Sequence, residues 1–253
     1  MKPSIDTRMI AGRVFVPSSD SDRETHSEWE QIEFRLAQTR LDLYSSFRLL
    51  QQRYVAAGLS TANQPIRVEP FHFWRQSQVC VAQKGGRIVG CLTLVSPGPF
   101  GMPSEHSHPE MLGAVPAGSS VGEVTSFAIS NDSGLHSLDI FLGLTQLVQR
   151  FGLQNGVKYI FAVVHPRHAK FYQRAIGFEV ISDEIPCDRV EGSPGVALMV
   201  KLDDNEFCRP QWKKAYEPNR ITSKDDLRPR SMTESQKRFF SQYLPPMEFR
   251  RAA

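Results

Sequence analysis

The chain has 253 residues, of which 40% are hydrophobic and 23% charged, and its formal net charge is +3. This length suits one large or two small domains with a sizeable core, and the composition is that of an ordinary globular protein. No uninterrupted apolar run approaches the roughly 20 residues of a membrane helix, and the N-terminus lacks the order of a secretory signal, so we expect a cytoplasmic protein with no integral membrane segment.

Cysteine spacing and charge distribution add to this picture. Cys80, Cys91, Cys187 and Cys208 are scattered without CxxC or metal-ligand spacing, which favours free thiols in a reducing compartment over a disulfide framework. From Phe207 onward there are 11 Lys and Arg against 5 Asp and Glu. This basic stretch is either a solvated tail or a docking surface for an acidic partner.

Hydrophobic periodicity and turn residues divide the chain into three parts. We predict a flexible N-terminal arm (1–27), a folded domain (28–202) and a basic, proline-containing C-terminal extension (203–253). In chain order the predicted elements are a strand at 32–37, a helix at 41–54, strands at 78–83, 87–95 and 121–130, a helix at 135–151, a strand at 157–164, a helix at 169–176, strands at 179–182 and 195–202, and a helix at 232–243.

This order predicts an α/β (α+β) fold, in which a mixed sheet carries helices on both faces. Residues 96–120 are too rich in Pro and Gly for regular structure, and we expect His106 and His108 in this long loop to face solvent. Pro166 should end the strand before it. Residues 165–168 are therefore predicted to form a polar break between strand and helix.

Several segments carry a family resemblance: QQRYVAAGL, the hairpin KGGRIVGCLTL, GMPSE in the long loop, GEVTSFAI, and HPRHAKFYQRAIGFE. Together with the element order, they resemble the FeeM-type N-acyl amino acid synthases, a branch between GNAT acetyltransferases and acyl-homoserine-lactone synthases. The resemblance runs from about Ile32 to Leu202. It implies a GNAT-like, centrally splayed sheet, and transfer of a fatty acyl group, typically long-chain, from an acyl carrier protein thioester to an amino acid or similar small amine.

Two departures from the family pattern concern the acyl donor. His165 stands where the family usually has Asn, and residues 130–134 lack the glycine-rich loop that holds a pyrophosphate in coenzyme A-dependent GNAT enzymes. Because the phosphopantetheine of a carrier protein has a single phosphodiester, the sequence favours acyl carrier protein over acyl-CoA as donor. We expect no tightly bound cofactor and no nucleic-acid partner.

Glu123 is the candidate base. Amide formation from a thioester requires a neutral amine, a polarised carbonyl and a proton for the leaving thiolate. Glu123 is the only acidic side chain of strand 121–130, and alternation would place it on one face with Val121, Phe127 and Ile129. Burial there would raise its pKa and suit it to accept a proton near neutral pH, and the resemblance points to the same residue. A structural ion pair with an arginine is the alternative role.

Tyr172 is the candidate acid, because it occupies the place where GNAT-fold enzymes commonly carry a tyrosine beside the thioester sulfur. A phenol there would protonate the leaving thiolate; the alternative is a tyrosine of the core. The backbone of Phe127, Ala128 and Ile129 is predicted to bind the pantetheine arm, which can lie along a splayed strand like an added strand.

Polar residues near these strands complete the predicted site. Arg167 and His168 are predicted to contact the donor, since an arginine near a helix N-terminus can hold a phosphate or a carboxylate; capping in solvent is the alternative. Ser126, which lacks the flanking glycines of a hydrolase nucleophile, and His165 are predicted to contact substrate. No carboxylate or cysteine stands at a ligand spacing from the histidines, so we predict no metal site.

Three other functions fit the same pattern. One is an acetyl-CoA-dependent acetyltransferase, and another is an acyl-homoserine-lactone synthase, which would need S-adenosylmethionine. The third is a GNAT-fold binding module without catalysis, whose basic tail recruits an acidic partner. Acyl chain length and the identity of the amine depend on pocket shape, which the sequence leaves open.

Overall fold

The computed structural model describes residues 32–98, 101–131, 137–202 and 227–245; the predicted N-terminal arm and Cys208 lie outside these ranges. The strands are β1 (Ile32–Leu36), β2 (Ser77–Lys84), β3 (Arg87–Val95), β4 (Val121–Ile129), β5 (Tyr159–Val164), β6 (Glu179–Val180), β7 (Ile185–Cys187) and β8 (Ser193–Lys201). The helices are α2 (Arg40–Ala56), α3 (Glu110–Gly113), α4 (Ser137–Gln154), α5 (Pro166–Ile176) and α6 (Glu234–Ser241), with 3-10 turns η2 (Pro70–Phe73) and η4 (Asp188–Val190).

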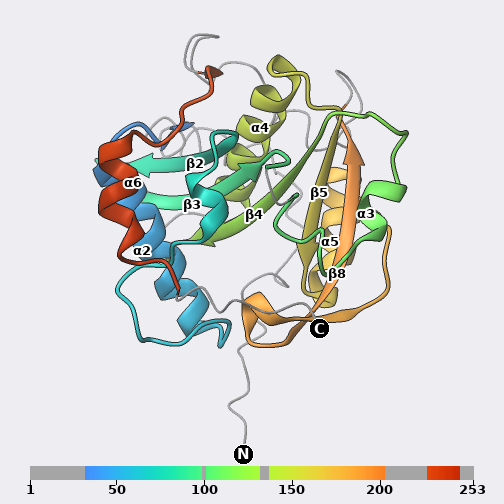
Figure 1. The fold of residues 1–253 in the computed structure, drawn as a ribbon, viewed down its shortest axis with the longest axis horizontal. Helices are drawn as coiled ribbons and strands as arrows, with labels where there is room; N and C mark the ends of the chain where they lie inside the picture. The colour runs from blue at the N-terminus through green and yellow to red at the C-terminus, as the bar shows by residue number, and fades with distance from the viewer. Residues whose placement is uncertain (1–31, 99–100, 132–136, 203–226, 246–253) are drawn as a thin grey trace, which may run out of the picture.

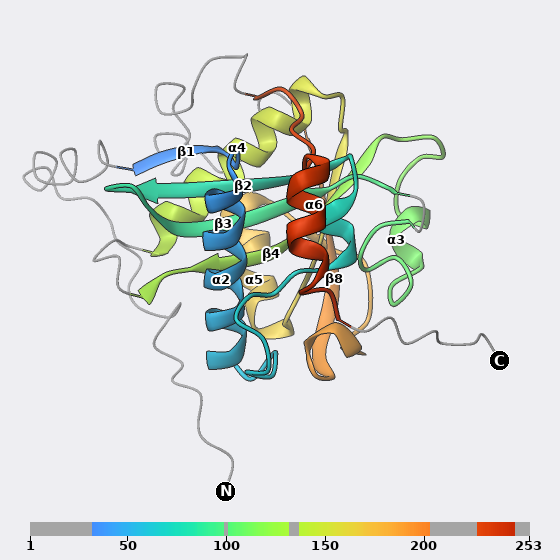
Figure 2. The same ribbon diagram turned by 60° about the vertical axis from the view of Figure 1, so that its left-hand side comes forward.

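The strands join in one sheet in the order β1-β2-β3-β4-β5-β8-β6, and β7 also pairs with β8. β4 and β5 run parallel, whereas the other described pairs are antiparallel. Helices cover both faces: α4 and α5 lie on one, and α2 and α6 on the other (Figure 1, Figure 2). The predicted mixed sheet with helices on both faces is confirmed.

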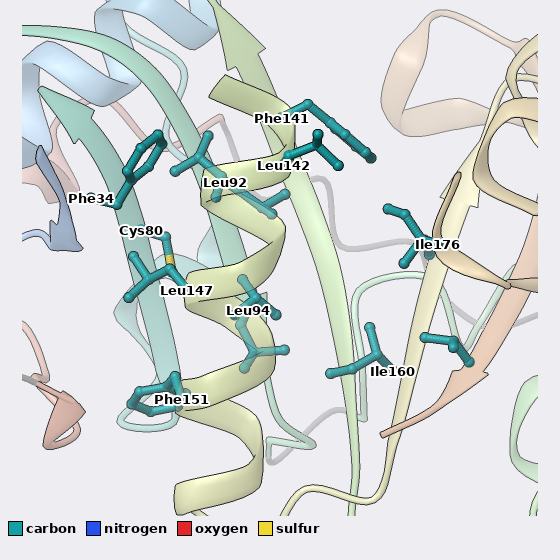
Figure 3. Packing of buried hydrophobic residues seen from close by; sticks show 14 of the residues in the cluster. Phe34, Cys80, Leu92, Leu94, Phe141, Leu142, Leu147, Phe151, Ile160 and Ile176 are labelled. Atoms are coloured by element: carbon teal, nitrogen blue, oxygen red, sulfur yellow. The ribbon is translucent and has the colours of Figure 1, made fainter. Parts of the chain in front are cut away.

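Strand alternation divides the core into two layers. In β2, Cys80 and Ala82 pack toward α4, while the intervening Val79 and Val81 pack toward α2. Figure 3 shows the first layer, where side chains of the strands meet α4. The helix comes closest to the sheet at Gly143, where a β-carbon would overlap the ring of Phe34.

The end of the basic C-terminal stretch packs onto the domain. Leu227, Met232 and Phe240 are buried, and the edge of the Phe240 ring meets Phe47 of α2 at 5.3 Å between centroids. The predicted helix is present, beginning after a Thr233 cap whose hydroxyl accepts a hydrogen bond from the backbone. This part of the stretch is therefore an element of the fold and not a solvated tail.

Helix α5 corrects the prediction of a polar break at residues 165–168, because it already begins at Pro166. Proline suits the first helical position, where its missing N–H would have no partner and its φ is already helical. His165 caps the helix, with its ring Nδ1 accepting the Arg167 N–H at 3.2 Å. Gly177 ends it with φ of 85°, as a left-handed cap.

The segment 101–120 is also more ordered than predicted. It contains α3, and Met102 and Met111 bury their side chains against Val121 and Phe161 of the sheet. His106 is exposed as expected, but His108 is fully buried, so its predicted exposure is wrong. The physical reason is that this segment covers a face of the sheet that α2 does not reach.

Two further findings bear on the predicted class of protein. Cys80, Cys91 and Cys187 are buried and free, as predicted. Within the described ranges, no helix combines the length and apolar character required to cross a membrane.

An ion pair fixes the start of α2. Both guanidinium NH groups of Arg35 donate to the Asp42 carboxylate at 2.9 Å, and the same carboxylate accepts the backbone N–H groups of Gln38 and Thr39. Burial opposes ionisation of Asp42, but the hydrogen bonds from Arg35 and the backbone prevail and hold its pKa well below the usual range.

Replacing this carboxylate should destabilise the fold in a pH-dependent way. We expect Asp42→Asn to lower the free energy of unfolding by about 2–4 kcal/mol at neutral pH, because it leaves the partly buried Arg35 with only the exposed Glu33 as an anionic partner and weakens a helix cap. Since the pKa of Asp42 is depressed in the folded state, its contribution is full above the ordinary aspartate pKa of about 3.9 and is lost as pH falls through the folded-state value. The difference between the proteins should therefore shrink in acid.

Urea unfolding near pH 7 and near pH 3 would measure this difference. Glu33→Gln is the matched control, because Glu33 also pairs with Arg35 but is largely exposed, and surface pairs contribute about 0–1 kcal/mol. An Asp42→Asn loss of the same size at both pH values would contradict the role given to the ionised carboxylate.

Candidate active site

The sheet parts at its centre. β4 pairs with β5 only from Val121 to Val124, whereas β4 stays paired with β3 as far as Ile129 and β5 stays paired with β8 as far as Val164. The two strands diverge from one another (Figure 1), and their pairing ends at Val124. The predicted central splay is confirmed, and it leaves the backbone of residues 127–129 without a strand from β5 beside it.

A β-bulge lies within the same stretch. Cys91 pairs with Ala128 and Thr93 with Thr125, so Ser126 and Phe127 together face one residue of β3. Ser126 adopts φ of 55°, which is uncommon for a residue other than glycine. The extra residue reverses the alternation of side chains along β4.

This reversal corrects the prediction that Glu123, Phe127 and Ile129 share a face. Phe127 and Ile129 pack with the core layer under α4. Val121, two residues before Glu123, packs instead with Met102 and Met111 on the other side. Strict two-residue alternation of side chains fails here because it assumes that β3 and β4 pair without a bulge.

Glu123 is the most buried of the predicted site residues, with 1% of its surface exposed. Ser104 donates to its carboxylate twice, from the backbone N–H at 2.8 Å and from the hydroxyl at 2.6 Å. Burial nevertheless raises the pKa of Glu123, against the opposing effects of Arg189 and of the Ser104 hydrogen bonds. The predicted burial and raised pKa are confirmed, while the predicted role as base stays a prediction.

Arg189, on η4, is the cation that acts on Glu123. Its Nη2 donates to the Thr125 hydroxyl at 3.3 Å, and its guanidinium lies over the ring of Phe71 at 5.5 Å. The backbone carbonyl of Arg189 accepts a hydrogen bond from Arg67 at 2.7 Å. A loop that carries no motif thus supplies the main positive charge of the site.

Arg67, which donates to the Arg189 backbone, belongs with Phe71 and Arg189 to one wall of the site. It pairs with Glu69 at 2.6 Å and lies over the ring of Tyr54 at 4.9 Å. Neither arginine was predicted, because both lie in irregular segments without periodicity. The only signal in the sequence was indirect: a carboxylate predicted to be buried implied a nearby cation that no strand or helix supplied.

Tyr172 reaches the splay from the other face. It is half-buried, and its ring contacts Phe141 at 5.4 Å and Phe178 at 5.7 Å between centroids. Burial raises the pKa of Tyr172, and the neighbouring Tyr54 raises it further. Burial raises the pKa of Tyr54 as well, and Arg67 and Arg189 oppose this rise electrostatically.

Two hollows lie near these elements. A cavity of about 20 Å³, room for about one water, touches Tyr172 and is otherwise lined by Leu92, Val124, Phe141, Thr145, Val148, Ile160 and Phe178. A larger, open hollow of about 590 Å³ lies between residues 107–110 and 180–185. The residues that line the larger hollow include none of the predicted site residues.

The structure places the histidines at a separate location, the start of α5. The rings of His165 and His168 lie 6.2 Å apart, and burial, assisted by Arg167, lowers the pKa of each. Arg167 itself is exposed. In the described part of the chain, no three His, Cys, Asp or Glu side chains cluster as a metal site would need.

Ser126 is buried at the bulge, where its carbonyl accepts a hydrogen bond from the Cys91 thiol at 3.8 Å. Most of the loop at residues 130–134, on which the donor prediction depends, lies outside the described residues. The predicted contacts of Ser126, His165, Arg167 and His168 with donor or substrate therefore stay predictions.

Comparisons with known proteins agree with this geometry. The family model described as N-acyl amino acid synthase FeeM matches residues 45–201. The structure of FeeM, an N-acyl amino acid synthase from uncultured soil microbes, aligns with a TM-score of 0.61 at 19% identity, over 68% of this chain and 93% of that one. None of the curated proteins compared with the chain matches it.

Two acyl-homoserine-lactone synthases also align. LasI does so with a TM-score of 0.57 at 17% identity, over 76% of this chain and 96% of its own. The CoA-dependent synthase BjaI, solved with SAM and isopentyl-CoA, aligns with a TM-score of 0.55 at 18% identity, over 73% of this chain and 89% of its own. These alignments confirm the predicted GNAT-like fold.

The buried carboxylate of Glu123 should make the free energy of unfolding depend on pH. Since the folded-state pKa of Glu123 is raised, the unfolded chain ionises first, and the wild type loses stability as pH rises from about 4.3 through the folded-state value. Glu123→Gln removes this penalty and can keep both Ser104 contacts. Relative to the wild type, we expect the free energy of unfolding of Glu123→Gln to rise by about 1.4 kcal/mol for each pH unit between the two pKa values.

Urea unfolding across a pH series would test this. Ser104→Ala should act in the opposite sense, because losing a hydrogen bond to the ionised carboxylate raises the Glu123 pKa further, so that this variant loses stability over a wider pH range than the wild type. A constant difference between wild type and Glu123→Gln at every pH would show that Glu123 titrates as an ordinary glutamate.

Proposed function

This chain belongs to the FeeM family of N-acyl amino acid synthases, and on that premise we propose that it moves a fatty acyl group from a thioester donor to the amine of an amino acid or similar small amine. Family membership makes it an N-acyltransferase. The donor, the chain length and the acceptor are the proposal. One observation carries it: Glu123, with its raised pKa, lies at the point where β4 and β5 part.

In the proposed reaction, Glu123 takes a proton from the acceptor ammonium, directly or through a water. The neutral amine attacks the thioester carbonyl carbon, so that a C–N bond forms, the C–S bond breaks and the electron pair leaves on sulfur. The proton that the nitrogen loses as it becomes an amide ends on this sulfur, which gives the free thiol. A glutamate with an ordinary pKa of about 4.3 would be a weak base for this step. The raised pKa of Glu123 supports its role.

Tyr172 has a complementary role in this proposal. Because its pKa is raised, the phenol stays protonated near neutral pH and can donate a hydrogen bond to the sulfur as negative charge develops there. Glu123 and Tyr172 approach β4 from opposite faces, which suits an amine arriving on one side and a thioester on the other.

For the donor we propose acyl carrier protein. The parting of β4 and β5 supports a pantetheine arm lying along residues 127–129 as an added strand, with Arg167 and His168 toward its phosphate. Ser126 and His165 are the proposed substrate contacts. A long acyl chain is the proposed cargo, and acyl-CoA is the alternative donor.

A direct assay would test the reaction and the donor together. The protein would be incubated with carrier proteins loaded with acyl groups of varied length, or with the matching acyl-CoAs, and with a pool of amino acids and amines. Mass spectrometry should detect N-acyl amino acids formed from the carrier. Consumption of acyl-CoA while the carrier-bound groups stay intact would overturn the donor assignment.

The same assay tests the base. We expect Glu123→Gln to lower kcat/KM by about 100-fold or more. In the wild type, the acid limb of the pH profile should lie above the range of an ordinary glutamate, and the variant should lack it. The remote Glu33→Gln provides the control, and an unchanged acid limb in Glu123→Gln would assign the proton transfer to another group.

A further inference from the structure

Arg189 has a partly buried side chain, and one nitrogen of its guanidinium group is left without a hydrogen-bond partner among the described residues. That nitrogen, Nη1, is itself buried. Its contacts are a neutral hydroxyl on Thr125 and the face of Phe71. No described carboxylate lies within 4 Å of its guanidinium, and burying a cation without an anionic partner is costly.

Two other partly buried arginines on the same side of the sheet, Arg67 and Arg35, differ from Arg189 because each has a carboxylate partner. Arg67 pairs with Glu69 at 2.6 Å, and Arg35 with Asp42 at 2.9 Å. Arg67 also donates to the backbone carbonyl of Arg189. A satisfied arginine therefore holds in place the turn that carries the unsatisfied one, which is how a binding group is kept in a fixed orientation.

A second buried donor lies on the adjoining wall. His72, next to Phe71, is 2% exposed, and burial, assisted by Arg67 and Arg189, lowers its pKa to about 3. Its Nδ1 accepts the Glu69 N–H at 3.0 Å, so the neutral ring carries its proton on Nε2, which has no partner among the described residues. This wall therefore has two hydrogen-bond donors without partners among the described residues, Arg189 Nη1 and His72 Nε2, and a ligand with acceptor atoms would satisfy them.

We propose that Arg189 binds the carboxylate of the acceptor, which makes this chain selective for α-amino acids over amines that lack a carboxylate. This inference rests on the proposed function. Thr125, which orients Arg189, and Glu123 are alternate residues of one strand, about 7 Å apart along it. An amino acid held at Arg189 thus carries its amine one carbon from the anchored carboxylate, within the reach of Glu123 directly or through a water.

Acceptor selectivity gives the test. For wild type and Arg189→Gln, kcat/KM would be measured with an amino acid, its carboxamide and its decarboxylated amine, using one acyl donor. We expect Arg189→Gln to lose about 100-fold for the amino acid, mostly through KM, as removal of one partner of a charge pair predicts. The carboxamide and the decarboxylated amine lack the carboxylate, so the loss for them should come only from the effect of Arg189 on Glu123 and be much smaller, and the selectivity for the amino acid collapses.

Two matched variants separate this role from damage to the fold. Arg48→Gln makes the same replacement at an exposed position and should leave the selectivity unchanged. Arg67→Gln should weaken the selectivity partially, because it loosens Arg189 without touching the ligand. An Arg189→Gln variant that loses the same factor for all three acceptors would overturn the carboxylate assignment.

Binding without a donor distinguishes this inference from the proposed function. The amino acid alone should raise the Tm of the wild type and of Arg48→Gln, and not that of Arg189→Gln. If this pattern holds while no thioester is turned over, the carboxylate site stands and the proposed reaction fails. If the wild type transfers acyl groups but prefers the amines that lack a carboxylate, the reaction stands and the carboxylate site is wrong.

Discussion

Beyond Val124 the backbone of β4 loses β5 as its partner, and the bulge at Ser126 turns its side chains over within the next few residues. Both irregularities are unfavourable in a sheet, since ladder hydrogen bonds are given up and a residue with φ of 55° costs of order 1 kcal/mol. The other features of the site depend on this arrangement.

Two partly buried arginines show how the same side chain is used in different ways. Arg35 has a carboxylate, a helix cap and Gln83 around it, and it serves to join β1 to α2. Arg189 contacts the hydroxyl of Thr125 and the ring of Phe71, and its Nη1 has no hydrogen-bond partner among the described residues. A structural ion pair is complete within the chain, whereas a binding group is left incomplete until its ligand arrives.

Regular hydrogen bonding explains what could be foreseen from the sequence. The β2–β3 hairpin, the helices and the burial of Glu123 follow from periodicity, which reports a repeating local geometry. The bulge at Ser126, the burial of His108 and the placement of Arg189 do not follow, because each is set by contacts between segments far apart in the chain. The start of α5 was predictable in principle, since proline is favoured at a first helical position.

The packing of Phe240 on Phe47 joins two positions almost 200 residues apart, and it covers α2, the helix that brings Tyr54 to the site. At roughly 5–20 residues per second, a ribosome needs on the order of 10–40 s to travel between them. During that interval the aromatic face of α2 is made but not covered by its partner. The wall of the site therefore reaches its final form only after Phe240 has been made, and the nascent chain exposes this face of α2 until then.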